Sequence, residues 1–231
     1  MAIERLPMTD PSPAIRAVAP QFAACLAFVL REEGGFSQDA RDSGGATNYG
    51  ITIGDLTRWR RRPCSPADVR GMEQKEAVSL YAAWYWTPLS CAMLPAGLDL
   101  IVFNAGVNMG IPTAAIQVQR RVGADQDGHL GPMTAVAARG APREALMRGL
   151  LDDQATRYRS LSTFDVFGHG WMSRLNRCAA LAWSMAGLAS VPPVLSVAPT
   201  IRPVPVVSVA QSTGETTDAL NDDELRTLTG A

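Results

Sequence analysis

Two acidic side chains and a glycine-rich loop stand close together near the start of the chain. Glu33 opens the segment 33–36 (EGGF), and nine residues later Asp42 opens the segment 42–52 (DSGGATNYGIT). Cleavage of a glycosidic bond needs one carboxyl group that gives a proton to the leaving oxygen and a second polar group that positions water or stabilises the developing charge. Glycines let the backbone of such a loop approach a ligand closely. The two segments therefore predict a site that cleaves sugars.

A helix must hold the first acid and a flexible loop the second. Apolar residues from Phe22 to Leu30 recur at helical spacing, which predicts a helix over residues 18–32. Its apolar surroundings would favour the protonated form of an acid at its end. Residues 34–52 contain too many Gly, Asp, Ser and Asn for a helix, so they predict a loop or a short hairpin.

The rest of the chain up to Leu188 predicts further helices, and no run of strand periodicity interrupts them. Residues 96–109 are apolar nearly all round, which is typical of a central buried helix. Ser65 is expected to cap one helix, with Pro66 in its first turn and Asp68 close to its start. The other expected helices span 53–61, 73–86, 113–122, 132–138, 142–161 and 169–188. The predicted fold class is all-α, with at most one small hairpin.

Composition and charge describe a globular chain without a dedicated nucleic-acid surface. Of its 231 residues 47% are hydrophobic, and the net charge is −1. Residues 1–187 carry 19 basic and 17 acidic side chains, or +2, which is compatible with an anionic polymer substrate. Four cysteines without C-x-x-C spacing and two isolated histidines predict free thiols, no metal site and no cofactor.

The two ends of the chain differ from its body. Residues 1–15 read as a flexible leader, and residues 188–231 as a disordered tail rich in Pro, Val and Ser, with a partner-binding extended segment as the alternative. The apolar run 17–30 is shorter than the about 20 residues of a membrane span and lacks the basic start of a signal peptide. We therefore expect a protein that is made in the cytoplasm and needs a separate release route to act outside it.

Five blocks in order resemble glycoside hydrolase family 108, the N-acetylmuramidases of phage endolysins and of bacterial secretion-associated lysozymes. The resemblance covers about residues 18–186. Its fourth block resembles the peptidoglycan-binding module that usually follows the catalytic part. The blocks are 33–36 with 42–52; Tyr81, Tyr85 and Trp86 with Leu94 and Pro95; 102–110; 117–119 with 127–134; and 158–160 with Phe164, 167–171 and Arg174.

The resemblance implies a lysozyme-like α fold and hydrolysis of the β-1,4 bond between N-acetylmuramic acid and N-acetylglucosamine in peptidoglycan, with Glu33 as the catalytic acid. It divides the chain into a catalytic part (16–111) and a peptidoglycan-binding helical module packed on it (112–187). By analogy with phage-type lysozymes, Asp42 and Thr47 would hold water on the opposite face of the sugar. An enzyme of this kind would act on the periplasmic cell wall after release by a holin or by secretion machinery.

Several assignments have a competing interpretation. Asp42 either takes part in catalysis or braces its loop, and Glu32 is expected to be an exposed surface charge. The predicted substrate-binding residues each have a structural alternative, which is to tie the loop or to lie in the core. They are Asn48, Tyr49, Trp86 and Asn108.

Two other functions fit the same residues. A lytic transglycosylase can work with one glutamate and releases anhydro products, whereas an Asp42–Thr47 pair favours hydrolysis. A non-catalytic wall-binding or secretion-assisting protein would keep the fold and bind peptidoglycan without cutting it.

Overall fold

The computed structural model describes residues 19–37 and 45–189, and these are mostly helical. The predicted leader, Asp42 and nearly all of the predicted tail lie outside the described residues. The elements are α2 (Pro20–Glu33), β1 (Thr47–Asn48), β2 (Ile51–Thr52), α3 (Ile53–Arg60), α4 (Pro66–Arg70), α5 (Gln74–Tyr81), η1 (Ala82–Trp86), η2 (Cys91–Met93), α6 (Leu98–Met109), α7 (Ile111–Val122), α8 (Pro132–Gly140), α9 (Arg143–Ser160) and α10 (Phe164–Met185). The predicted all-α class with one small hairpin is confirmed.

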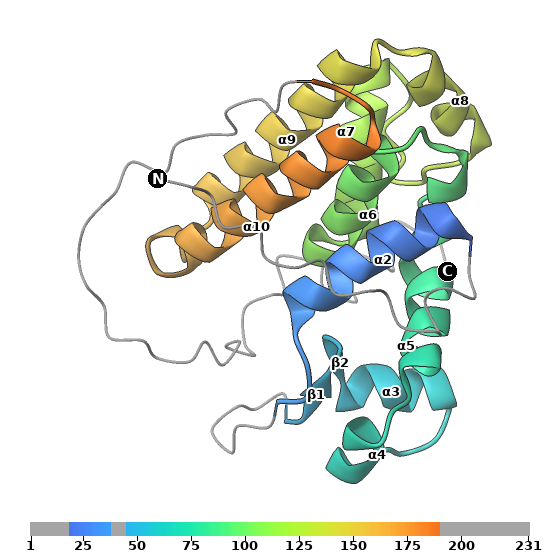
Figure 1. Cartoon of the computed structure of the whole chain (residues 1–231), viewed down its shortest axis with the longest axis vertical. Coiled ribbons are helices and arrows are strands. Elements are labelled where there is room, and N and C mark those ends of the chain that lie inside the picture. Colours follow the sequence, from blue (N-terminus) through green and yellow to red (C-terminus); the bar gives the residue numbers. More distant parts are fainter. Residues whose placement is uncertain (1–18, 38–44, 190–231) are drawn as a thin grey trace.

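Helix α6 is the centre of the fold. Ten of its twelve residues are buried, from Leu98 to Met109, as its uniformly apolar sequence predicts. Helices α7, α9 and α10 pack against it on one side of the molecule, and α2 packs on it from another (Figure 1). One hydrophobic core runs from Phe22 to Ala186, so the parts predicted as catalytic part and binding module share it.

Helix starts follow the local chemistry of the sequence. The Ser65 hydroxyl accepts from the backbone N–H of Asp68, and the Asp68 carboxylate accepts from the Ser65 backbone, which closes a capping box at the start of α4. The predicted cap is therefore confirmed. An equivalent box between Thr52 and Asp55 starts α3 directly after the hairpin.

Two helices differ from their prediction by more than one or two residues at an end. The helix predicted over 73–86 is α5 followed by the π-helical turn η1, in which the N–H of Thr87 bonds to the carbonyl of Ala82. The last helix begins at Phe164 rather than at residue 169, although Gly168 lies within it. A β-carbon at Gly168 would lie 2.6 Å from the Phe164 ring, so this glycine serves close packing and does not break the helix.

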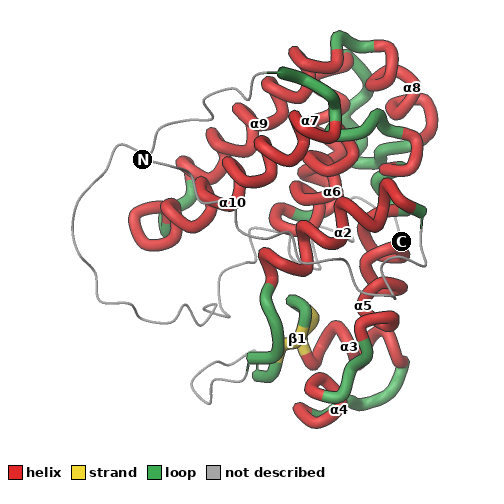
Figure 2. Tube along the Cα trace, viewed as in Figure 1, coloured by secondary structure: helices red, strands yellow, loops and turns green. Residues whose placement is uncertain are grey.

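Strands β1 and β2 form a hairpin below α2, and its first strand also touches the segment that follows α2 (Figure 2). Thr47 pairs with Thr52 and Asn48 with Ile51, which leaves Tyr49 and Gly50 as a two-residue turn. Both turn residues have positive φ, 54° and 75°, which is typical of the type I′ turn that matches strand twist. The hairpin turn is thereby directed at the end of α2.

Candidate active site

Glu33 is the last residue of α2, and its side chain is largely enclosed. Gly34 follows with φ 78°, a conformation that favours glycine and ends the helix. The side chain of Glu33 is 12% exposed. The apolar face of α2 therefore delivers a mostly buried carboxyl group to the junction between the hairpin and the helical body (Figure 1).

Arg174 on α10 binds this carboxyl group. Its Nη1 donates to Oε1 of Glu33 over 2.7 Å, and the arginine side chain is itself only 13% exposed. The two residues lie 141 positions apart in the sequence. No local sequence motif predicts such a contact, so the spacing of residues around Glu33 could not identify Arg174 as its partner.

Two asparagines of α6 hold Arg174 in place. The Nε of Arg174 donates to Oδ1 of Asn104 over 3.0 Å, and the amide nitrogen of Asn108 donates to the same oxygen over 3.1 Å. Asn108 also donates to the carbonyl of Asn104 over 2.6 Å. The predicted site residue Asn108 thus reaches the acid through Asn104 and Arg174, and its contact with substrate stays a prediction.

The hairpin turn packs directly on Glu33. A β-carbon at Gly50 would lie 2.8 Å from Oε2 and 2.9 Å from Cγ of Glu33, so the close approach requires glycine. The hydroxyl of Tyr81 donates to the carbonyl of Tyr49 over 2.9 Å and anchors the same turn. Tyr49, a predicted substrate contact, is partly buried and packs at the edge of the core.

Three tyrosines around the site stay uncharged at neutral pH. Burial, and then the charge of Glu33, raises the pKa of the Tyr81 hydroxyl well above its ordinary value. Burial raises the pKa of Tyr85 to about 12, and that of Tyr158 to about 12 although Arg174 opposes the change.

Glu32 does not lie at the surface as expected. Its side chain is 6% exposed, and Arg177 on α10 donates to both of its oxygens, over 2.9 and 2.5 Å. Positions three apart on a helix lie on one face, so Arg174 and Arg177 bind the two consecutive acids that end α2. The expectation was wrong because the partner of Glu32 lies 145 residues away.

The second predicted catalytic group can be placed only in part. Thr47 is partly buried in β1, and its backbone exchanges two hydrogen bonds with Ser37, of 2.8 and 2.9 Å. Asp42 lies outside the described residues. The bridge between Ser37 and Thr47 brings together the two ends of the loop to which Asp42 belongs.

Two predicted substrate contacts have partners within the protein. Asn48 is 6% exposed, and its amide donates to the carbonyl of Val69 over 3.1 Å, which ties the hairpin to α4. Trp86 is 7% exposed and packs between the rings of Phe22 and Phe103, at centroid distances of 5.0 and 5.5 Å. Both residues thus make the structural contacts that the sequence left open, because η1 turns Trp86 inward and β1 turns Asn48 toward α4, and their contact with substrate stays a prediction.

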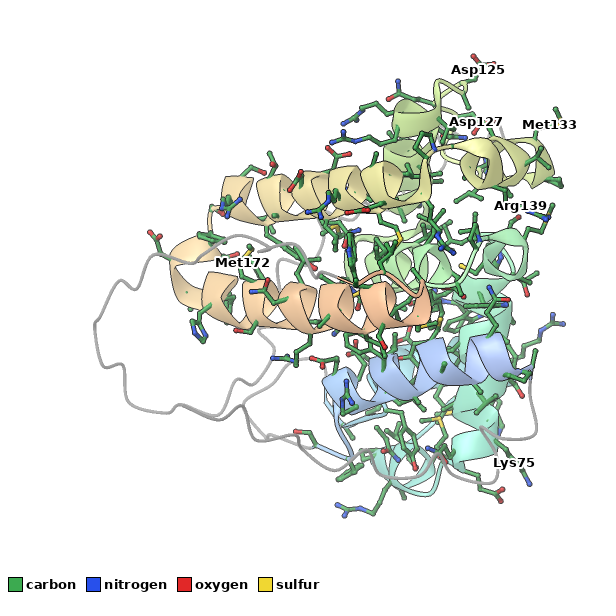
Figure 3. All side chains as sticks on the ribbon, turned by 45° about the horizontal axis from the view of Figure 1, so that its top comes forward. Lys75, Asp125, Asp127, Met133, Arg139 and Met172 are labelled. Carbon is green, nitrogen blue, oxygen red and sulfur yellow. The ribbon has the colours of Figure 1, made fainter. Side chains whose placement is uncertain are left out.

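A hollow of about 500 Å³ lies elsewhere, between α3 and α5. Arg60 and Glu76 line it and bond to each other over 2.6 and 2.8 Å. Lys75 also lines it and lies at the edge of the molecule (Figure 3). Glu33 is not among its lining residues. Because the half-buried charges of Arg60 and Glu76 satisfy one another, Glu33 remains the candidate for the reaction.

Comparison with known proteins agrees with this site. The family model described as glycosyl hydrolase 108 matches residues 26–110, which include Glu33, the hairpin and α6. A solved structure of SagA from Brucella abortus is 34% identical; the match covers 71% of this chain and 95% of that chain, with a TM-score of 0.65. Among curated proteins, none matches the chain. The chain therefore belongs to glycosyl hydrolase family 108, a family of peptidoglycan-hydrolysing enzymes, and is itself a glycoside hydrolase.

Proposed function

We propose that the enzyme is an N-acetylmuramidase that hydrolyses the β-1,4 bond between N-acetylmuramic acid and N-acetylglucosamine, with Glu33 as general acid. One observation carries this proposal. The carboxyl group of Glu33 is mostly buried, with Oε1 bonded to Arg174 of α10 and Oε2 beside the bare backbone of Gly50 in the hairpin turn. A fixed acid in an enclosed site is what protonation of a glycosidic oxygen requires.

The proposed reaction uses the second acid as a base. Glu33 gives its proton to the glycosidic oxygen while the bond from that oxygen to the anomeric carbon breaks. Water adds to the anomeric carbon from the opposite face and gives its proton to Asp42, with Thr47 holding the water. Inversion by this route needs the two carboxyl groups about 6.5–9.5 Å apart. In the sequence Asp42 stands five residues from both Ser37 and Thr47, the two residues whose backbones pair.

We also propose that residues 112–187 help to bind peptidoglycan. Support comes from α10, which belongs to this part of the chain and supplies the partner of Glu33. Within the motif that resembles a binding module, Gln119 donates to Asp127 over 2.5 Å and accepts from the backbone of Gly128 over 3.1 Å. These bonds fix the shape of the loop that contains Asp127 and Gly128. They do not involve the side chain of His129, which is exposed.

The proposed route to the wall runs through other proteins. In the described part of the chain, no helix combines the length and the apolar character needed to cross a membrane. From the resemblance to phage endolysins and secretion-associated lysozymes, we propose that a holin or secretion machinery releases the enzyme. Co-expression with a pore-forming holin should produce lysis, and expression alone should not; lysis without the pore would contradict this route.

The experiment that tests the function compares wild type with Glu33→Gln on purified sacculi and identifies products by mass spectrometry. Reducing muropeptides from wild type alone would establish a muramidase with Glu33 as its acid. Anhydro-muropeptides would instead identify a lytic transglycosylase. If both proteins bound sacculi and neither released products, the non-catalytic binding protein would be the better description.

A further inference from the structure

We propose that Arg174 is a positioning residue of this glycosidase: it fixes the carboxyl group of Glu33 through Oε1, so that Oε2 carries the proton for the leaving oxygen. The inference rests on the proposed role of Glu33 and deepens it. It assigns a distinct task to each oxygen of the acid, and to a residue far outside the motif that contains the acid.

The hydrogen bond between the two residues is made to one oxygen only. Nη1 of Arg174 donates to Oε1 of Glu33 over 2.7 Å, whereas Oε2 faces Gly50. A guanidinium has donors and no acceptor, so Oε1 must offer it a lone pair. When the carboxyl group of Glu33 is protonated, the hydrogen therefore lies on Oε2, where the absence of a side chain at Gly50 leaves room.

The arginine can act in this way because it is itself fixed. Its Nε is bonded to Asn104, which is fully buried on the central helix α6, and Asn108 bonds to the same oxygen. With Nε and Nη1 both engaged, the planar guanidinium has one orientation. Lysine has three donors on one nitrogen at the end of a flexible chain, so it lacks the rigid fork that holds Glu33 and Asn104 at fixed positions.

The charge of Arg174 also matches the charge that the reaction creates. As the proton leaves Oε2, the carboxyl group of Glu33 becomes negative in a mostly enclosed setting. A preorganised cation at 2.7 Å stabilises that developing charge without having to reorient.

The neighbouring ion pair provides a matched control. Arg177 joins the same two helices as Arg174, through Glu32, but its side chain is 51% exposed and bonds to neither Glu33 nor Asn104. If Arg174 served only to fasten α2 to α10, substitution of either arginine would change kcat to the same extent. A positioning role predicts that the two substitutions differ in catalysis.

The test measures kcat, KM and Tm of Arg174→Gln, Arg174→Lys and Arg177→Gln on soluble glycan strands prepared from sacculi, beside wild type and Glu33→Gln. We expect Arg174→Gln to lose about 100-fold in kcat with little change in KM, because a small misplacement of an acid has an effect of that size. Arg174→Lys should fall between Arg174→Gln and wild type. Arg177→Gln should keep the wild-type kcat.

A folding defect is separated from a positioning defect by chemical rescue. In Arg174→Ala, added guanidinium at concentrations well below those that unfold proteins should restore part of kcat, and it should not do so in Glu33→Gln. Wild-type kcat in Arg174→Gln, an equal loss in Arg177→Gln, or no rescue of folded Arg174→Ala would overturn the proposal. An active Glu33→Gln would instead overturn the proposed function, which keeps the two failures distinguishable.

Discussion

Gly50→Ala tests how closely the hairpin turn and the acid depend on each other. Gly50 has φ 75°, and a β-carbon there would lie within 2.8–3.0 Å of three atoms of Glu33, which are Oε2, Cγ and Cβ. Real β-carbons essentially never approach other heavy atoms so closely. The substitution must therefore move either the turn or the side chain of Glu33.

Its cost has a backbone part and a contact part. A non-glycine residue in a left-handed conformation costs about 1–2 kcal/mol, which in a chain of this size lowers Tm by roughly 2–8 °C. The contact part acts on Glu33. A displacement of about 1 Å at a reacting group can reduce the rate about 100-fold, so we expect a loss of kcat of that order in addition to the loss of stability.

Gly123→Ala separates the two parts. Gly123 ends α7 with φ 70°, and a β-carbon there would meet nothing within 4 Å. Both variants should lose similar Tm in thermal unfolding followed by circular dichroism, and only Gly50→Ala should lose muropeptide release. Suppose instead that Gly50→Ala and Gly123→Ala had the same Tm and that Gly50→Ala kept the wild-type kcat. The packing of the turn against Glu33 would then not control the position of this acid, and the reasoning would be refuted.

Three further predictions concern the core. Burial raises the pKa of the Asp99 carboxyl group. The contribution of Asp99 to stability is therefore complete below about pH 4 and is lost as the pH rises through the raised pKa. The Tm of Asp99→Asn, measured relative to wild type, should rise from acid to neutral pH, and a constant difference would contradict this. Trp86→Ala should cost about 3–5 kcal/mol in urea unfolding, whereas Trp86→Phe should keep the wild-type KM; a raised KM would support the predicted sugar contact. A fragment ending at residue 110 should show no cooperative thermal transition, since it exposes the α6 surface that α7, α9 and α10 cover; a cooperative one would make residues 26–110 an independent domain.

The sequence predicts best what neighbouring residues decide. The helix before Glu33, the cap at Ser65 and the glycine-rich turn depend on residues within a few positions of one another, and all three take the expected form. The buried character of α6 also follows from its composition, because a helix that is apolar on every side has no face to expose.

Long-range contacts decide the rest. The partner of Glu33 is Arg174, and nothing in the residues around either one specifies the other. Glu32 is of a residue type that usually lies at the surface, but its side chain is buried and paired with Arg177. The residue type of Trp86 fits both a sugar contact and a place in the core, and its environment is set by Phe22 and Phe103, two rings from other elements. In each case tertiary packing selects between alternatives that a local pattern leaves equal.

The distance in sequence between Glu33 and Arg174 has a consequence for the synthesis of the enzyme. A ribosome completes the acid and its glycine-rich loop early, but the arginine appears 141 residues later and must then dock on α6. Contacts that close so long a loop form late in folding, because the chain loses loop-closure entropy before the contacts themselves stabilise it. A growing or truncated chain therefore carries the acid without its fixed partner, and we expect a wall-cutting activity to begin only when the last helix is in place.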